Sequence, residues 1–124
     1  MAVIVVEKDI NRQLTIISVT GETTADEITR TIVAHNSREM TRLILWDLTK
    51  ATFQTLTGNQ VRDFAQTTRQ FLDRRKGGKT AVVVPSDLGF GLARMYDIVQ
   101  ENTQMQVSHM TFREKELALQ WLLE

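Results

Sequence analysis

The segment Lys79–Tyr96, KTAVVVPSDLGFGLARMY, decides the fold of this chain. Its first part, 81–84, is a continuous apolar run, which predicts a strand buried inside a sheet. The turn residues Pro85, Ser86 and Asp87 follow at once, and then comes an apolar stripe at helical spacing, formed by Leu88, Leu92, Met95 and Val99. A buried strand followed directly by such a helix is typical of a parallel α/β sheet. Ligands and partners of these sheets meet the loops at the carboxyl ends of the strands, so a functional site is expected there.

The composition is that of one globular domain. The chain has 124 residues, of which 42% are hydrophobic and 24% charged, so it is long enough for a substantial core. Its 15 basic and 15 acidic side chains cancel, and we therefore expect neither nucleic acid nor an anionic membrane as a partner. The absence of cysteine excludes disulfides, thiol catalysis and cysteine-ligated metal sites. The N-terminal apolar run 2–6 is too short for a signal peptide or a membrane span, so we expect a cytoplasmic protein without membrane insertion.

Hydrophobic periodicity predicts a single domain, 1–124, with the order ββαβαβαβα. The expected strands are 2–7, 13–20, 43–46, 79–84 and 106–112, and the expected helices are 25–36, 58–76, 87–102 and 114–123. A short turn joins the first two strands into an antiparallel hairpin, and helical crossovers predict parallel pairing after it. The fold class is thus α/β, with a five-stranded, mostly parallel mixed sheet. The basic triplet 74–76 is interpreted as the C-terminus of the second helix rather than as an anion site.

The chain carries no motif that identifies an enzyme or a cofactor site. Gly78-Lys79-Thr80 resembles the end of a phosphate-binding loop, but it leads from a helix into a strand, so no helix N-terminus receives the phosphates. Gly89-Phe90-Gly91 lacks the third glycine of a dinucleotide-binding loop. His35 and His109 lack metal-ligand spacing, and Ser86 lacks the GxSxG turn of a hydrolase nucleophile. We therefore expect no catalytic residue, metal or cofactor, and an unrecognised hydrolase-like activity stays open as an alternative.

Large apolar residues lie at an unusual place, in the segments that follow two predicted strands. Phe53 and Leu56 fall in the predicted loop 48–57, and Phe90 begins the helix after strand 79–84. Because the carboxyl ends of parallel strands share one edge of the sheet, we expect these side chains to converge. Two interpretations stay open: a small core that caps the sheet, or a ligand groove or partner surface. The candidate ligand- or partner-binding residues are Asp47, Thr49, Phe53, Leu56, Ser86, Asp87, Phe90 and Arg94.

A family resemblance rests mainly on the segments 45–48 (LWDL), 83–96 (VVPSDLGFGLARMY) and 112–122 (FREKELALQWL). Together with the order ββαβαβαβα, they resemble the SpoIIAA-like (STAS-type) fold family, and more closely its uncharacterised branch of bacterial stand-alone domains. The resemblance covers nearly the whole chain. It implies regulatory binding rather than catalysis, with a protein partner, a second copy of the chain in a homodimer, or both.

The same resemblance implies a phosphorylation site. Anti-sigma-factor antagonists of the family are switched by phosphorylation of a Ser or Thr at the start of the second helix. That position corresponds to Thr57, with Thr55 and Thr49 as weaker candidates. A phosphate there would meet the free amides of a helix N-terminus. The family's compact Asp-Ser-Ser/Thr-Gly signature is absent, because a long loop separates Asp47 from Thr57, so a plain N-cap role for Thr57 stays open.

A related branch of the fold resembles the CRAL-TRIO lipid-transfer domains, which hold apolar ligands. Phe53 and Phe90 fit this resemblance as apolar side chains near the expected site. The alternative function is therefore a carrier or sensor of a small apolar, lipid-like ligand, bound at the loops that follow the third and fourth strands.

Overall fold

The computed structural model describes residues 2–36, 40–72, 75, 77–101 and 107–124. Over these residues the chain forms five strands and four helices in the order ββαβαβαβα, which confirms the predicted fold class. The strands are β1 (Val3–Asp9), β2 (Leu14–Glu22), β3 (Leu43–Thr52), β4 (Lys79–Val83) and β5 (Ser108–Phe112). The helices are α1 (Ala25–Asn36), α2 (Gly58–Leu72), α3 (Asp87–Glu101) and α4 (Lys115–Leu123).

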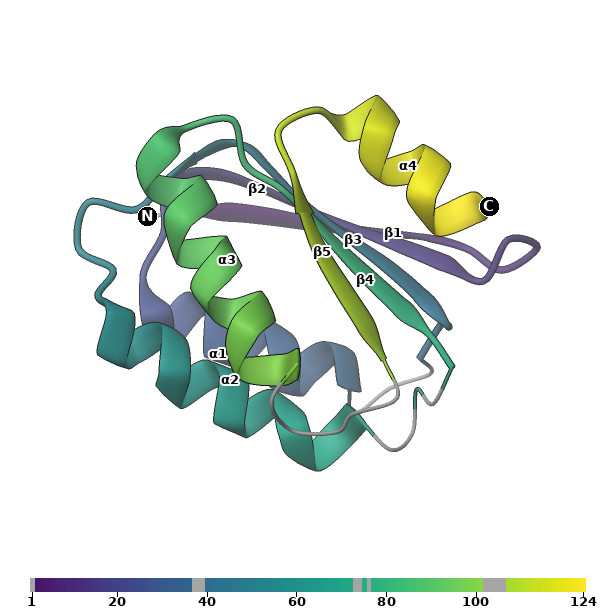
Figure 1. Ribbon diagram of the computed structural model, residues 1–124, viewed down its shortest axis with the longest axis horizontal. Coiled ribbons are helices and arrows are strands. Elements are labelled where there is room, and N and C mark those ends of the chain that lie inside the picture. The colour runs from purple at the N-terminus through teal and green to yellow at the C-terminus, as the bar shows by residue number, and fades with distance from the viewer. Residues whose placement is uncertain (1, 37–39, 73–74, 76, 102–106) are drawn as a thin grey trace.

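The strands form one sheet in the order of the sequence, β1-β2-β3-β4-β5. β1 and β2 pair antiparallel, as the predicted hairpin requires, and the other neighbouring pairs are parallel. Crossovers of one hand that each advance by one strand place their helices on the same face of a sheet. Accordingly, α1, α2 and α3 cover one face, while α4 follows the last strand and returns over the opposite face (Figure 1).

The sheet buries a core on each face because side chains alternate along its central strands. Leu43 and Leu45 of β3 face α4, in a buried cluster completed by Leu14, Ala81, Val83, Ala118 and Leu122. Ile44 of the same strand faces the other side, in a cluster with Ile17, Val19, Leu48, Phe53, Val82 and Val84. The apolar run 81–84 thus supplies both cores, which is why it contains no alternating polar residue.

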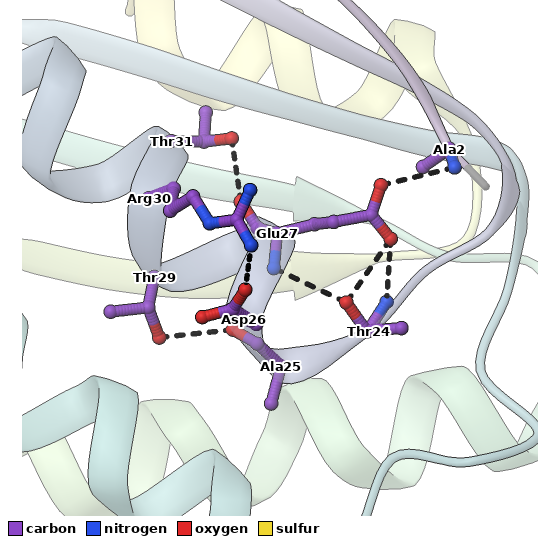
Figure 2. Close-up of polar contacts among 8 residues, drawn as sticks. All are labelled: Ala2, Thr24, Ala25, Asp26, Glu27, Thr29, Arg30 and Thr31. Atoms are coloured by element: carbon purple, nitrogen blue, oxygen red, sulfur yellow. Dashed lines mark hydrogen bonds and ion pairs between the residues drawn. The ribbon is translucent and has the colours of Figure 1, made fainter.

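α1 begins with a reciprocal capping arrangement that also holds the start of β1 (Figure 2). The Thr24 hydroxyl accepts a hydrogen bond from the Glu27 amide at 3.2 Å, and Glu27 Oε1 accepts one from the Thr24 amide at 3.2 Å. Glu27 Oε2 accepts a third from the Ala2 amide at 3.1 Å. The amide of Ala2, followed by that of Thr24, lowers the pKa of the Glu27 carboxyl. Asp26 and Arg30 form an ion pair one turn apart on the exposed side of the helix.

The third strand is longer than the sequence predicts. Strand 43–46 was expected to end at Asp47, but β3 continues to Thr52 because its second half pairs with the end of β2 beyond a bulge between Ser18 and Thr20. The Glu22 carboxylate fixes this pairing, since it accepts hydrogen bonds from the Thr52 hydroxyl and the Gln54 amide, both at 2.9 Å. The predicted loop 48–57 is therefore reduced to the residues between Thr52 and Gly58.

The described part of the second helix, α2, ends at Leu72, and the sequence predicts a helix to residue 76. Residues 73, 74 and 76 of that prediction lie outside the described residues. Of the basic triplet 74–76, only Arg75 lies among the described residues, and its side chain is 6% exposed. Arg75 is therefore a buried cation, and it lies outside α2, whereas the sequence predicted it in the last turn of the second helix. The Gly78 amide donates to the Arg75 carbonyl at 2.8 Å, and Gly77 has a φ of 82°, so a tight glycine turn leads directly into β4.

Candidate functional site

The segment after β3 and the start of α3 lie against each other at the carboxyl edge of the sheet. A Cβ on Gly89 would lie 3.3 Å from Phe53 Cδ2 and 2.8 Å from Ser86 Oγ, and it would overlap Val84 Cγ1. Only glycine allows α3 to approach the end of β4 and the Phe53 ring this closely. Phe53 itself is 6% exposed, so its ring lies under α3 and not on the surface.

Phe53 and Leu56 line an apolar cavity of about 70 Å³ between the sheet and the layer of α1, α2 and α3. Side chains of the sheet form one wall of the cavity, and side chains of these helices form the opposite wall. The lining residues are Ile28, Ile32, Trp46, Leu48, Phe53, Leu56, Val61, Phe64, Thr80, Val82, Val84, Gly89, Leu92, Ala93 and Tyr96. Nearly all of these side chains are apolar, which suits an apolar group and not a polar one.

Phe90 lies apart from this cavity, on the outer side of the same edge. The guanidinium carbon of Arg113 lies 4.4 Å from the centroid of its ring. Arg113 Nη1 also donates to the Pro85 carbonyl at 3.0 Å and to Asp87 Oδ1 at 2.9 Å. Sequence reasoning did not select Arg113, although it directly follows β5, whose carboxyl end lies at this edge.

Ser86 caps α3. Its hydroxyl accepts a hydrogen bond from the Gly89 amide at 3.1 Å, and its carbonyl accepts one from the Phe90 amide at 2.8 Å. Arg94 lies further along α3 with a half-exposed side chain, and its Nη1 is 3.8 Å from the buried Asp97 Oδ2.

Asp47 and Thr49 also lie outside the cavity lining, which includes only Phe53 and Leu56 among the candidate residues. Asp47 Oδ1 accepts hydrogen bonds from the Thr49 amide at 3.1 Å and from the Thr49 hydroxyl at 2.7 Å. Asp47 Oδ2 lies 3.4 Å from Lys115 Nζ at the start of α4, on the side of the sheet opposite α1 to α3. Partial burial raises the pKa of Asp47, but the Thr49 hydrogen bonds and the Lys115 ammonium outweigh it and lower the pKa overall. The carboxylate is therefore engaged in joining β3 to α4.

Thr57 begins α2 with a second capping box. Its hydroxyl accepts a hydrogen bond from the Gln60 amide at 3.2 Å, and Gln60 Oε1 accepts one from the Thr57 amide at 3.0 Å. The Thr57 side chain is exposed, as is that of Thr55. The hydroxyl is thus accessible from solvent while it caps the helix.

A second, polar cavity of about 20 Å³ lies beside the apolar one. The two share Ile32, Trp46, Thr80 and Tyr96, and the polar cavity is completed by His35, Ile44, Thr68, Arg75 and His109. Burial, followed by the nearby Arg75 charge, lowers the pKa of both His35 and His109 to about 4. Both histidines are therefore neutral at pH 7, and Arg75 is the cation of this cavity.

Two further chemistries find no support within the part of the chain that the structure describes. No group of three or more His, Cys, Asp or Glu side chains there could hold a metal ion. None of the described helices is long and apolar enough to cross a membrane.

Solved structures share this fold. The chain superimposes on an uncharacterised protein of the DUF3478 family with a SpoIIAA-like fold from Shewanella loihica PV-4, with a TM-score of 0.59 and 17% identity, over 98% of this chain and 93% of that one. It also superimposes on an anti-sigma factor antagonist from Mycobacterium paratuberculosis, with a TM-score of 0.60 and 15% identity, over 100% of this chain and 96% of that one. No family model and no curated protein matches the chain.

The resemblance predicted from the sequence is confirmed for the fold, which is SpoIIAA-like. At these identities the likeness establishes the fold and does not establish an activity. The predicted relation to CRAL-TRIO domains is not tested by either structure and stays a prediction.

Proposed function

We propose that the protein is a non-enzymatic regulatory module that binds another protein through the outer face of α3. The observation that carries this proposal is the exposure of apolar side chains on that face, where Leu88 is 59% exposed and Ile98 is 47% exposed. The SpoIIAA-like fold supports it, because the fold is shared with an anti-sigma factor antagonist.

The outer face of α3 combines apolar groups with a cation. Leu88, Gly91, Arg94 and Ile98 share one side of the helix at helical spacing, and all are exposed. A Cβ on Gly91 would meet nothing within 4 Å, so the helix surface is open between Leu88 and Arg94. A partner that offers apolar side chains and a carboxylate would cover both kinds of group.

Site-specific crosslinking tests this surface. A photoreactive residue at position 88 or 98 is expected to crosslink one and the same protein in a lysate of the source organism. The same label at Leu117, which is 48% exposed on α4, serves as the matched control. With the purified partner, Leu88→Ser combined with Ile98→Ser should weaken binding about tenfold or more, whereas Leu117→Ser should not. Equal crosslinking at all three positions, or equal affinity of all variants, would refute the proposal.

Regulation of this module is proposed to act at Thr57. A phosphoryl group on its exposed hydroxyl would lie at the N-terminus of α2, where free amides and the helix dipole favour negative charge. Mass spectrometry of the protein isolated from its source cells should find phosphate at Thr57 and not at Thr55. Thr57→Glu should then change the affinity for the partner, and an unmodified Thr57 under all growth conditions would contradict this part of the proposal.

The proposal also places the module in the cytoplasm and includes self-association into a homodimer. Native mass spectrometry of the purified chain measures directly whether it forms a homodimer. A dimer that persists on dilution would support self-association. A monomer at all concentrations would leave the partner as a different protein.

A second candidate function is favoured by the apolar cavity. We propose as the alternative that the protein carries or senses a small apolar ligand, held by Phe53, Leu56 and the inner side of α3. The same native mass spectrum tests it, because a carried ligand adds mass to the folded protein. A ligand in excess should also raise the melting temperature, since it binds only the folded state.

A further inference from the structure

The first strand, β1, lies at one edge of the sheet. Within the described residues it pairs with β2 alone, so the backbone groups on its outer side have no strand beside them. Its apolar side chains are open as well, since Val3 is 63% exposed, Val5 48% and Val6 47%. An exposed apolar edge is a template for the addition of another strand, and natural monomers protect such edges with charged residues or proline.

The side chains of β1 alternate between the two faces of the sheet. Ile4 packs at the margin of the core cluster under α1 to α3, so Val6 and Lys8 share that face. Val5 and Glu7 lie on the opposite face, where α4 packs on β3, β4 and β5 and leaves this edge exposed. Charge begins only at Glu7, so the first half of the edge is unprotected.

A second copy of β1 fits the geometry of this edge. Two-fold symmetry is the commonest arrangement of identical subunits. When two identical strands pair antiparallel about a two-fold axis normal to the sheet, residues that face each other lie on the same side of the sheet. The axis then passes through one residue, which faces its own copy. Residues that turn their N–H and C=O groups outward meet residues that do the same, so the ladder of hydrogen bonds forms.

The sequence of β1 favours an axis at Val5. This register sets Ile4 against Val6 on both sides of the axis and Val5 against itself, so apolar residues meet at the centre. An axis through Val6 would set Ile4 against Lys8, which pairs an apolar side chain with a charged one. An axis through Glu7 would set two carboxylates against each other, which is unfavourable.

The same register brings opposite charges together. It sets Lys8 of the second copy opposite Ala2, whose amide donates to Glu27 Oε2 at 3.1 Å (Figure 2). The Lys8 ammonium and the Glu27 carboxylate then meet on the helix side of the sheet, once on each side of the axis. The amide of Ala2 lowers the pKa of the Glu27 carboxyl, which is therefore charged at pH 7. An axis through Ile4 would put Val6 opposite Ala2 instead and would remove this ion pair.

We propose that two copies of the protein associate through β1, antiparallel about an axis at Val5, and join their sheets into one. This proposal deepens the homodimer part of the proposed function and rests on it. Because the axis is normal to the sheet, α1, α2 and α3 of both copies lie on one side of the joined sheet (Figure 1). α3 packs against β5, at the edge opposite β1, so the outer face of α3 stays accessible in both copies.

Single cysteines test the register, because the chain contains none. Val5→Cys lies on the axis, so mild oxidation should link two copies of this variant into a covalent dimer. Val3→Cys lies four residues along the strands from its own copy, about 13 Å, and should link poorly by itself. A mixture of Val3→Cys and Glu7→Cys should link efficiently, because these two residues face each other in the proposed register.

Sedimentation equilibrium measures the strength of the dimer. Val5→Lys sets two ammonium groups against each other and should weaken the dimer about tenfold or more. Leu117→Lys on α4 is the matched control, because Leu117 is also 48% exposed, and it should leave the dimer unchanged. Lys8→Glu keeps the apolar centre and should weaken the dimer about threefold or more. Circular dichroism shows whether each variant is folded.

The outcomes separate this interface from the rest of the proposed function. A dimer that Leu117→Lys weakens and Val5→Lys does not would overturn the β1 interface but leave self-association standing. Self-linking of Val3→Cys as fast as that of Val5→Cys would overturn the register. A monomer at every concentration would overturn both the interface and the homodimer. Binding of a partner at α3 is measured separately, by crosslinking at Leu88 and Ile98, and does not depend on these results.

Discussion

Phe53 and Phe90 were predicted from the sequence to share one role, but the structure implies that they contribute differently to stability. Phe53 is 6% exposed and lies between the sheet and α3. Truncating a buried phenylalanine to alanine costs about 3–5 kcal/mol. Because Phe53 borders a cavity into which its neighbours are able to relax, we expect Phe53→Ala to lower the free energy of unfolding by about 3–4 kcal/mol, in the lower part of that range.

Truncating Phe90 to alanine should cost less free energy of unfolding than truncating Phe53. It is half-buried, so its truncation forfeits about half of the 1.5–3 kcal/mol that full burial of such a side chain contributes. The Arg113 guanidinium over its ring adds about 0.5–1 kcal/mol, the value for exposed cation–π pairs. We therefore expect Phe90→Ala to lower the free energy of unfolding by about 1–2.5 kcal/mol.

Calorimetry and urea unfolding measure this difference. For 124 residues, 1 kcal/mol corresponds to a shift in melting temperature of about 4 °C. Phe53→Ala should thus melt about 12–16 °C below the wild type and Phe90→Ala about 4–10 °C below it. Unchanged urea m-values would confirm that both variants unfold from the same native state. A Phe53→Ala variant within 1 kcal/mol of the wild type, or one more stable than Phe90→Ala, would refute the placement of Phe53 in the core.

Other predictions concern close packing, helix capping and pH. Gly89→Ala should lower the free energy of unfolding by about 2 kcal/mol in urea titrations, because the added methyl group overlaps Val84. Thr57→Ala should cost about 1 kcal/mol in the same assay through loss of the α2 cap, whereas Thr55→Ala should change it by less than about 0.5 kcal/mol. Burial lowers the pKa of His35 and His109 from 6.5 to about 4, so between these pH values the unfolded chain binds more protons than the folded one. The free energy of unfolding therefore keeps its full value above pH 6.5 and falls as the pH falls toward 4, by on the order of 3 kcal/mol per histidine. Urea titrations of a variant with both His35 and His109 replaced by Gln should not show this loss.

The sequence predicted the elements whose pattern is local. The run 81–84 has no polar residue because it fills both cores, and this property is visible without the structure. The end of β3 is different, since the residues after Leu48 are mostly polar and pair with β2 only because Glu22 and the bulge position them. Such pairing depends on a partner strand about thirty residues away, which no local pattern reports.

Arg75 shows the same limit at the candidate site. A basic residue before two glycines is typical of an exposed helix C-terminus, and that interpretation uses only neighbours in the sequence. The carbonyls that bind its guanidinium belong to Thr41 and Arg42 at the start of β3, and to Lys79 at the start of β4. They come together only because these strands lie side by side in the sheet. By contrast, the sequence was enough to predict that the segment after β3 and the start of α3 meet at the carboxyl edge, because parallel pairing alone brings them there.

The two candidate functions meet on one helix. The inner side of α3 carries Leu92 and Tyr96, which line the cavity, while its outer side carries Leu88 and Ile98 for the proposed partner. A ligand that changes how α3 packs on the sheet would change the position of the outer face as well. Thermodynamic linkage then requires the partner to alter the affinity for the ligand by the same factor by which the ligand alters the affinity for the partner. The two proposed functions are therefore compatible, because a ligand bound under α3 would change the affinity of the outer face for its partner.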